Sequence, residues 1–276
     1  MTDLRNKVAV ITGAGSGIGC ALAKALAREG ARVAMLDLQC EQLDAAVEQV
    51  RAGGGEAIGI VADVFDAAAI EAAAAATINA FGKVHILVNN AGVCLRGPKL
   101  FEVGDDIWNW MLGVNLFGTL HCLRTFVPLI SSHGEGGHIL TTGSVSGFVS
   151  TNRRTGVYTT TKYALTGLTD SLSDELEGTG IGVSLLLPGW VKTEIYANSA
   201  SLRGTLCAAT AFDAPTTEFA KFMSADEVAA RAIAGIKANQ PYIATDPQAR
   251  AMHQQRHRVL MAAYDAAEAW HPEAGE

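Results

Sequence analysis

The chain has 276 residues and a net charge of −7, with 49% apolar and 18% charged residues. This length and composition allow a sizeable buried core and exclude intrinsic disorder. The acidic balance lacks the clustered Lys and Arg that a nucleic-acid or anionic-membrane partner requires. No apolar run approaches the roughly 20 residues of a bilayer span, and residues 1–7 lack a signal-peptide pattern. We therefore expect a cytoplasmic protein with neither kind of partner.

Short runs rich in Val, Ile and Leu alternate with longer Ala-rich and Leu-rich segments as far as about residue 190. Most of these runs are continuously apolar, which is typical of parallel strands covered on both faces. The pattern predicts an α/β fold with a doubly wound parallel sheet of the Rossmann type, a three-layer α/β/α sandwich in one domain over residues 1–276. The predicted strands are Val8–Thr12, Arg32–Asp37, Glu56–Val61, His85–Asn89, Gly137–Thr141, Gly182–Leu187 and Tyr242–Ala244.

The segments between the strands have the composition and the ends of helices. Gly17–Glu29 stops at Gly30 and Cys40–Ala52 stops at a run of three glycines, as expected for glycine C-caps. Ala67–Ala80 is so rich in alanine that a helix is favoured over a linker. Residues from about 194 to 222 are small and polar without a clear period, which predicts a mobile insertion that acts as a substrate lid.

The first predicted strand leads directly into a glycine-rich turn, Thr12–Gly19, and a helix. Gly13 allows a tight turn, Gly17 lets the backbone approach a pyrophosphate, and Gly19 permits close packing of helix on strand. The spacing is G-x-x-x-G-x-G rather than G-x-G-x-x-G. The turn predicts a phosphate cradle, with a purely structural turn as the alternative.

Asp37 ends the second predicted strand, near the position at which an acidic residue accepts hydrogen bonds from an adenosine ribose. A carboxylate there repels a 2′-phosphate, and Leu38–Gln39 supply no compensating cation. NAD is therefore preferred over NADP. Arg32 begins the same strand and should lie too far away to help, whereas the sequence does not place Arg5 and Lys7.

Tyr158 and Lys162 are four residues apart, which puts a phenol and an ammonium group on one helix face. A nearby cation favours the phenolate and makes the pair usable for taking a proton from an alcohol. Any amphipathic helix can carry such a pair, but this one follows a predicted strand that runs into Ser144. Ligands of open α/β sheets bind at such a carboxyl edge.

With these residues in view, the sequence resembles the classical short-chain dehydrogenase/reductase family over about residues 5 to 193. From Met223 onward it is similar to the usual ending of the family. The resemblance is carried by the turn Thr12–Gly19, the element Asn89–Gly92, Asn115, Ser144, the pair Tyr158 and Lys162, and the element Pro188–Thr193.

The resemblance implies a role for each of these residues. Tyr158 would be the general acid/base, Lys162 would lower its pKa and hold the nicotinamide ribose, and Ser144 would hydrogen-bond the reacting oxygen. Asn115 would interrupt regular helix bonding and hold a water molecule in a proton path. The implied cofactor contacts are Gly13, Ser16, Gly17, Ile18, Gly19, Asp37, Asp63 and Val64 at the adenine, Asn90, Gly92, Tyr158, Lys162, Pro188, Gly189, Val191 and Thr193.

The loop between Ser144 and Tyr158 departs from the family pattern. Tyr158 follows Ser144 by fourteen positions, whereas thirteen is common, so Ser146 is an alternative to Ser144. The Ser-x-x-Gly arrangement with Gly147 favours Ser144 and puts the extra residue in the loop 148–157. That loop also carries Arg153 and Arg154, which either recruit a carboxylate or are solvated charges, and the second interpretation is favoured.

The positions expected to face the substrate are mostly apolar, which suits a hydrophobic or aromatic secondary alcohol or ketone better than a sugar. They are Val93, Cys94, Leu95, Gly147, Phe148, Val149, Trp190 and Tyr196. The predicted function is NAD-dependent interconversion of such an alcohol and ketone. The alternatives are a non-catalytic NAD sensor, an NADP-preferring ketoreductase and, less favoured, an epimerase or dehydratase of the extended branch.

Two further expectations concern partners and metals. The family implies a homo-oligomer, with a tetramer built on the helices that contain Asn115 and Tyr158 favoured over a dimer. Five scattered cysteines without a Cys-x-x-Cys pair argue against disulfides and a thiolate zinc site. His253 and His257 have helical spacing but lack the glutamate of the HExxH pattern and a third ligand, so no metal site is expected.

Overall fold

The computed structural model describes residues 3–150, 154–206 and 222–270. The described chain contains one parallel sheet with the strand order β3-β2-β1-β4-β5-β6-β7. Each pairing between neighbouring strands is parallel, which confirms the predicted doubly wound sheet. The strands are β1 (Val8–Thr12), β2 (Arg32–Asp37), β3 (Ala57–Val61), β4 (Ile86–Asn89), β5 (Gly137–Thr142), β6 (Ile181–Leu187) and β7 (Tyr242–Ala244).

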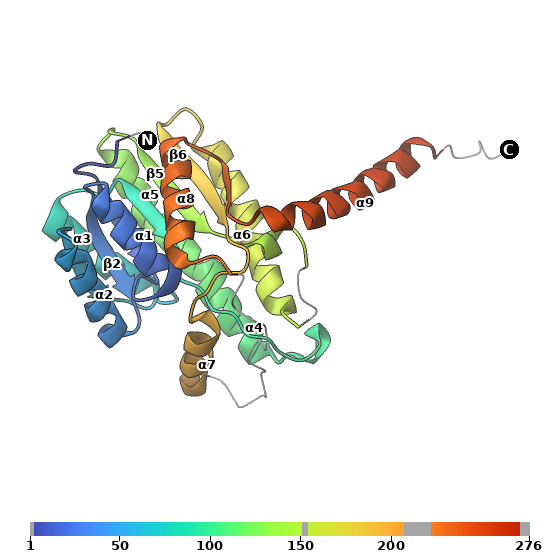
Figure 1. The fold of residues 1–276 in the computed structure, drawn as a ribbon, viewed down its shortest axis with the longest axis horizontal. Coiled ribbons are helices and arrows are strands. Elements are labelled where there is room, and N and C mark those ends of the chain that lie inside the picture. The colour runs from blue at the N-terminus through green and yellow to red at the C-terminus, as the bar shows by residue number, and fades with distance from the viewer. Residues whose placement is uncertain (1–2, 151–153, 207–221, 271–276) are drawn as a thin grey trace.

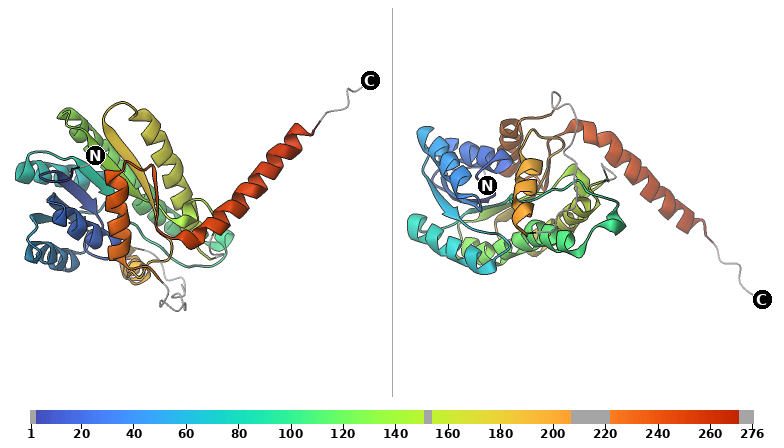
Figure 2. Two further views of the ribbon diagram at one scale, coloured as in Figure 1. Left: turned by 45° about the horizontal axis from the view of Figure 1, so that its top comes forward. Right: turned by 90° about the horizontal axis from the view of Figure 1, so that it is seen from below.

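Helices cover both faces of this sheet (Figures 1 and 2). One hydrophobic core joins α1 (Gly17–Arg28), α2 (Cys40–Ala52) and α8 (Ala225–Lys237) to one face. The other core joins α3 (Ala67–Phe81), α5 (Gly118–Ser132) and α6 (Gly156–Glu175) to the opposite face. Successive residues of β1 divide between the cores, with Ala9 and Ile11 in the first and Val8 and Val10 in the second. Burial on both faces explains why the strands lack polar alternation.

The strands and helices whose two ends were predicted begin and end within about one residue of the predicted positions. The alanine-rich segment is a helix as predicted, and the Asp66 carboxylate caps it by accepting a hydrogen bond from the Ala68 N–H at 2.9 Å. An alanine-rich helix of this kind is stabilised by packing, since its Ile70 and Ala73 side chains are fully buried against the sheet.

The prediction of an aperiodic insertion over residues 194–222 is wrong for its first part. Residues Ile195–Leu206 form a regular helix, α7. Its sequence lacks a clear apolar stripe. Hydrogen bonds to distant loops hold the helix in place instead: Asn198 donates to Ser16, and Ser199 accepts from the Cys94 N–H. The remainder of the expected lid, residues 207–221, lies outside the described residues.

The other elements lie around the carboxyl ends of the strands or beyond them. Figure 1 shows α4 and α7 at the lower end of the molecule, and α9 projecting away from it. None of the described helices combines the length and apolar character needed to cross a bilayer. The elements that lie around the carboxyl ends of the strands or beyond them are η1 (Leu100–Glu102), α4 (Asp105–Leu112), the π-helical turn η2 (Gly113–Phe117), η3 (Val145–Gly147), η5 (Pro247–Ala249) and α9 (Arg250–Glu268).

Candidate active site

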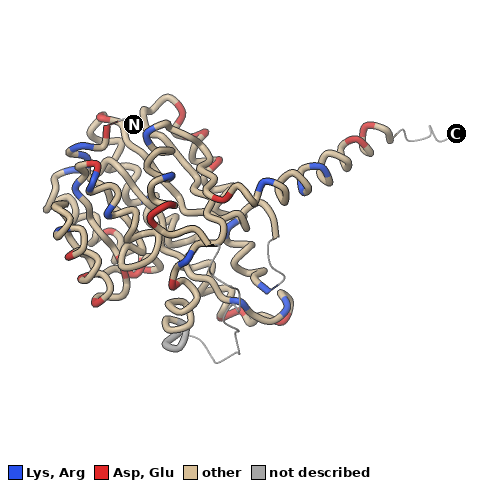
Figure 3. Tube along the Cα trace, viewed as in Figure 1, with Lys and Arg blue, Asp and Glu red and all other residues tan. Residues whose placement is uncertain are grey.

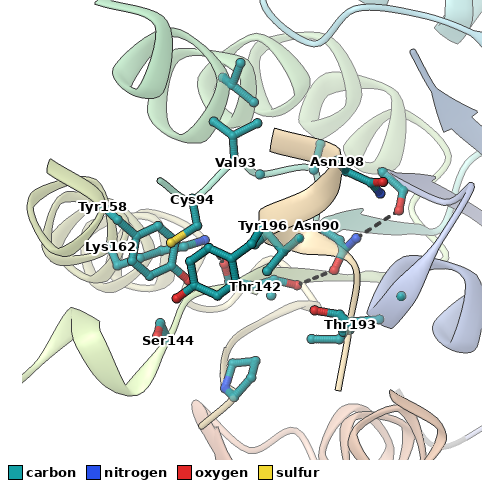
Figure 4. Close-up of a pocket in the computed structure, with 18 of the residues that line it drawn as sticks. Asn90, Val93, Cys94, Thr142, Ser144, Tyr158, Lys162, Thr193, Tyr196 and Asn198 are labelled. Carbon is teal, nitrogen blue, oxygen red and sulfur yellow. Dashed lines mark hydrogen bonds between the residues drawn. The ribbon is translucent and has the colours of Figure 1, made fainter. Parts of the chain in front are cut away.

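A cavity of about 510 Å³ opens at the carboxyl ends of the central strands. Its walls come from the turn after β1, the ends of β2, β4, β5 and β6, and the helices α6 and α7. The sheet order reverses direction between β1 and β4, and open α/β sheets bind ligands at such a switch point. The volume is in the usual range for a small-molecule site. Figure 4 shows the part of the cavity that contains Tyr158, Ser144 and Lys162.

The glycine turn has the form of an anion cradle. Gly13 and Gly17 adopt φ angles of 63° and 52°, which favour glycine. A Cβ atom at Gly13 would lie 2.8 Å from the Ala91 Cα atom, and one at Gly19 would collide with the Gly13 carbonyl oxygen. Ser16 precedes α1 without making a side-chain capping bond, so the first N–H groups of the helix can bind an anion. These features fit the pyrophosphate of a dinucleotide.

Asp37 lies at the carboxyl end of β2 and lines the cavity. Its carboxylate accepts hydrogen bonds from the backbone N–H groups of Gly15 and Gln39, both at 2.9 Å. These two bonds fix the orientation of the carboxylate and leave further lone pairs for ribose hydroxyls. The structure therefore confirms that Asp37 ends the second strand beside the glycine turn.

The basic residues that the sequence could not place lie away from Asp37. Arg32 begins β2 at the opposite edge of the sheet, Arg5 pairs with Asp3, and Lys7 pairs with Glu135. Among the described residues that line the cavity, Lys162 is the single lysine or arginine. The adenosine end of the cavity is thus acidic.

Asn90 joins the carboxyl ends of three strands (Figure 4). Its amide nitrogen donates to the carbonyl oxygens of Thr12 and Gly13 at 3.1 and 3.2 Å, and its amide oxygen accepts from the Thr142 hydroxyl at 3.2 Å. The resemblance implies that Asn90 contacts the adenosine side of the cofactor. Asn90 does line the cavity, but these bonds occupy much of its side chain and give it a positioning role.

Asn115 lies in the π-helical turn η2, so the predicted interruption of regular helix bonding is present. π-Helical turns inside α-helices are frequent at functional sites. The Asn115 side chain accepts from the Val93 N–H at 2.8 Å and donates to the Val93 carbonyl and the Thr161 hydroxyl, at 3.0 and 2.9 Å. It thereby connects the loop after β4 to α6, which carries Tyr158.

Ser144, Tyr158 and Lys162 converge at the inner end of the cavity. The Ser144 hydroxyl oxygen accepts from the Ser146 N–H at 3.0 Å, and the hydroxyl lies near enough to the Tyr158 phenol to act on its pKa. Lys162 donates to the Thr142 carbonyl at 2.8 Å, and its ammonium nitrogen lies 5.5 Å from the centre of the Tyr158 ring. The position of the Ser144 hydroxyl beside the phenol agrees with the choice of Ser144 over Ser146.

Burial has the largest effect on the titration of this pair. It raises the pKa of the Tyr158 phenol, and the hydrogen bond from Ser144 acts in the opposite direction. Burial lowers the pKa of the Lys162 ammonium to about 8. The sequence predicts that Lys162 lowers the pKa of Tyr158, but the net direction in the structure is upward because desolvation of a buried phenolate costs more than the nearby groups recover.

Most of the other predicted site residues line the same cavity. Gly19 does not, because it lies behind Gly13. Of the expected substrate contacts, Val93, Cys94, Trp190 and Tyr196 line the cavity. The predicted cofactor contacts on its wall are Gly13, Ser16, Gly17, Ile18, Asp63, Val64, Gly92, Pro188, Gly189, Val191 and Thr193.

The expectation that Leu95 and residues 147–149 face the substrate is wrong, because none of them lines the cavity. Val149 packs instead with Val145 and Ala249 in a separate small cluster. Arg154 donates to the Gly97 carbonyl at 3.1 Å and holds its loop, while Arg153 lies outside the described residues.

Asn198, Ser199 and Thr142 have site roles that the sequence did not predict. Asn198 connects α7 to the glycine turn, Ser199 connects it to the loop after β4, and Thr142 accepts the hydrogen bond from Lys162. These contacts join residues 20 to 182 positions apart, and no local pattern signals them.

One cluster of potential metal ligands lies at the amino edge of the sheet, far from the cavity, and includes His85, His133 and Glu135. Both ring nitrogens of each histidine are already engaged. His85 bonds the Val8 N–H and Glu135, and His133 bonds the Val84 carbonyl and the Glu135 N–H. Glu135 also pairs with two lysines. This cluster connects the strand ends through hydrogen bonds.

The chain matches known proteins in the same regions that form this site. The family model described as "short chain dehydrogenase" matches residues 7–203. A 1-deoxy-11-beta-hydroxypentalenate dehydrogenase from Streptomyces avermitilis is 38% identical over 191 residues, 69% of this chain and 70% of the relative. A cyclohexanol dehydrogenase from an Acinetobacter species is 34% identical over 192 residues, 70% of this chain and 76% of the relative.

A solved structure extends the likeness to nearly the whole chain. The crystal structure of a short chain dehydrogenase/reductase from Burkholderia phymatum in complex with NAD is 35% identical, with a TM-score of 0.88. The match covers 95% of this chain and 97% of that one. The matched family model, the sheet order and the cavity residues agree: this chain is an oxidoreductase of the classical short-chain dehydrogenase/reductase family.

Proposed function

We propose that the protein interconverts a secondary alcohol and a ketone with NAD as the hydride carrier. The observation that carries this proposal is the convergence of Ser144, Tyr158 and Lys162 at the inner end of a cavity that begins at a phosphate cradle. A nucleotide sensor needs the cradle but has no need for a serine hydroxyl and a buried lysine beside a phenol.

The chemistry follows from the atoms at this end of the cavity. A bound oxidised nicotinamide supplies the hydride acceptor and a positive charge. The Ser144 hydroxyl, whose oxygen accepts from the Ser146 N–H, lies beside the phenol and would donate a hydrogen bond to the substrate oxygen. The Tyr158 phenolate takes the hydroxyl proton of the alcohol. Lys162, whose ammonium nitrogen lies 5.5 Å from the centre of the Tyr158 ring, stabilises the phenolate. Asn115 holds the loop after β4 against α6 and so fixes the substrate wall relative to Tyr158.

The proposed substrate is hydrophobic and carries one reacting oxygen. Apolar and aromatic side chains dominate the wall next to Tyr158, where Val93, Trp110, Trp190 and Leu202 line the cavity. Burial raises the pKa of both the Cys94 thiol and the Tyr196 phenol, so they present neutral groups. A sugar would leave several hydroxyls unpaired on such a wall. The names of the cyclohexanol and hydroxypentalenate relatives support a carbocyclic alcohol.

The proposed cofactor is NAD rather than NADP. The Asp37 carboxylate faces the adenosine end of the cavity, and the described cations whose position was open lie elsewhere. The NAD bound to the Burkholderia phymatum relative agrees with this choice. A cytoplasmic location and a homo-oligomer remain predictions.

Purified protein should form NADH when it is incubated with NAD and a panel of cyclic secondary alcohols. Tyr158→Phe should lower kcat by about two orders of magnitude or more, because it removes the general acid/base while leaving the cavity shape. NADH formation is measured by absorbance. Tyr264→Phe, at an exposed position on α9, is the matched control. Turnover near the wild-type rate in Tyr158→Phe would contradict the mechanism, and NADH binding without any turnover would favour a sensor.

A further inference from the structure

Ser16 lies on the cavity wall at the junction of the glycine turn and α1. Its side chain does not cap the helix that it precedes, so the hydroxyl is available to another partner. That partner is Asn198 of α7, whose amide nitrogen donates to the Ser16 hydroxyl oxygen at 3.1 Å. The bond therefore joins the turn that fits a pyrophosphate to a helix that follows the last strand-end motif of the site.

The direction of this hydrogen bond decides what the Ser16 hydroxyl can do. A hydroxyl has one proton to donate and two lone pairs with which to accept. Because the Asn198 N–H occupies a lone pair, the proton of the hydroxyl remains for a further acceptor, and no described residue accepts it. A hydroxyl that accepts from an amide is also polarised and donates more strongly to its next partner. The pair is thus arranged to bind an anion.

The surroundings of the pair match a phosphate group. Gly17, the next residue along the chain, has a φ angle of 52° and begins α1, whose first N–H groups have no side-chain cap. A Cβ atom at Gly17 would lie 3.3 Å from the Thr193 methyl carbon, so Thr193 packs against the turn. Figure 4 shows Asn198 on the side of the cavity that holds Thr193, away from Tyr158. Asn198 therefore lies at the cradle rather than at the reacting atoms.

The charges of the cavity make neutral donors necessary for a pyrophosphate. Several acidic side chains line the cavity, and Lys162 is the single lysine or arginine among its described lining residues. Residues 195–202, the part of α7 whose side chains are described, carry no charge (Figure 3). Uncharged N–H and O–H groups must consequently hold the phosphate oxygens, and a hydrogen bond from such a group to an ionised acceptor is a strong one.

We propose that Asn198 is a positioning residue of the cofactor site, which holds the Ser16 hydroxyl as a donor to the pyrophosphate. The inference rests on the proposed binding of a dinucleotide and adds α7 to the phosphate cradle. Coupling of this kind is reciprocal. A bound pyrophosphate strengthens the bond that holds α7, and α7 in place strengthens the binding of the pyrophosphate. Since Tyr196 and Leu202 of α7 also line the cavity, the bound cofactor stabilises the wall that the substrate meets.

ADP-ribose tests the proposal without hydride transfer, because it contains the pyrophosphate and lacks the nicotinamide. Asn198→Ala should raise the dissociation constant of ADP-ribose about fivefold, the usual contribution of one hydrogen bond, as measured by isothermal titration calorimetry. The dissociation constant of adenosine, which lacks phosphate, should not change. In a Ser16→Ala background, Asn198→Ala should have little further effect on ADP-ribose, since Asn198 acts through the Ser16 hydroxyl. Equal losses in the two backgrounds would overturn the proposal.

Asn198→Asp separates a role toward phosphate from a purely structural one. The aspartate can accept the proton of the Ser16 hydroxyl, so α7 should stay attached, and limited proteolysis within α7 of the ligand-free protein should be as slow as in the wild type. The reversed bond withdraws that proton from the phosphate and adds a negative charge. ADP-ribose should therefore bind more weakly to Asn198→Asp than to Asn198→Ala.

The matched control is Ala200→Asp, which adds the same charge at an exposed position on the opposite face of α7 and should bind ADP-ribose as the wild type does. If Asn198→Asp also binds ADP-ribose as tightly as the wild type, Asn198 only fastens α7, and the proposal is wrong while the dinucleotide site stands. A wild type that binds no ADP-ribose would contradict the proposed cofactor site itself, and this inference with it.

Discussion

At the scale of single residues, burial disfavours the charged forms of Tyr158 and Lys162. It raises the pKa of the phenol and lowers the pKa of the ammonium to about 8. Before the cofactor binds, a neutral phenol therefore lies beside a lysine whose charged form is destabilised by burial. The positive charge of an oxidised nicotinamide bound beside the phenol would favour the phenolate, which would couple proton transfer to cofactor binding.

Lys162 should consequently destabilise the cofactor-free protein at neutral pH. Its pKa falls from 10.5 in the unfolded chain to about 8 in the folded one, so between these values the unfolded chain binds the extra proton and stability rises with pH. Below pH 8 the cost is fully present and is on the order of 3 kcal/mol. Lys162→Met should therefore unfold at a higher temperature than the wild type at pH 7, and the difference should shrink as the pH approaches 10.

The matched control for this comparison is Lys99→Met, which changes a largely exposed lysine. Its difference from the wild type should be small at both pH values. If Lys162→Met is less stable than the wild type at pH 7, the bond from Lys162 to the Thr142 carbonyl outweighs the cost of burying the charge, and the argument fails.

At the scale of elements, α7 is the part of the site that depends most on distant contacts. Asn198 donates to the Ser16 hydroxyl at 3.1 Å, and the fully buried Ser199 hydroxyl accepts from the Cys94 N–H at 2.9 Å. These two bonds tie α7 across the cavity, from the glycine turn to the loop after β4. The helix thus covers the region where substrate and nicotinamide would meet.

Ser199→Ala should weaken the attachment of α7 to the loop after β4. It leaves the Cys94 N–H without its partner in a buried place, which costs about 1–3 kcal/mol. Opening of α7 should become roughly 5-fold to 150-fold more frequent, and limited proteolysis within residues 195–206 should accelerate accordingly. Ser201→Ala, on the exposed side of α7, is the control. An unchanged cleavage rate in Ser199→Ala would mean that other contacts hold α7.

The central strands were predictable because they are largely buried apolar runs, and the motif residues at their carboxyl ends could be placed because they follow those runs directly. Helix α7 was not predictable, since its hydrogen bonds are to Ser16 and Cys94, which lie 182 and 105 positions away. The misplacement of residues 147–149 has a similar cause. The turn η3 directs Val149 toward Ala249, a contact that no local periodicity reveals.

At the scale of the whole molecule, the net charge of −7 opposes an anionic dinucleotide. The cavity reinforces this, because Asp37, Asp63 and Glu194 line it and Lys162 is the single cation among its described lining residues. Affinity must therefore come from short-range contacts, chiefly the N–H groups at the start of α1 and those of the glycine turn. Such contacts are insensitive to salt, whereas the repulsion acts over the Debye length.

NADH affinity should accordingly stay constant or increase as ionic strength rises, since the Debye length falls from about 30 Å at 0.01 M to about 3 Å at 1 M. NADH should bind more tightly than NADPH, and NADPH should gain more from added salt, because its 2′-phosphate would lie near the Asp37 carboxylate at the adenosine end of the cavity. Fluorescence titration of both nucleotides over this range measures the two dissociation constants. In Asp37→Asn, the dissociation constants of NADH and NADPH should lie closer together, and their ratio should no longer depend on salt. A tenfold loss of NADH affinity at high salt would instead reveal cationic contacts with the phosphates, and the affinity would then rest on side-chain charge rather than on the backbone of the glycine turn.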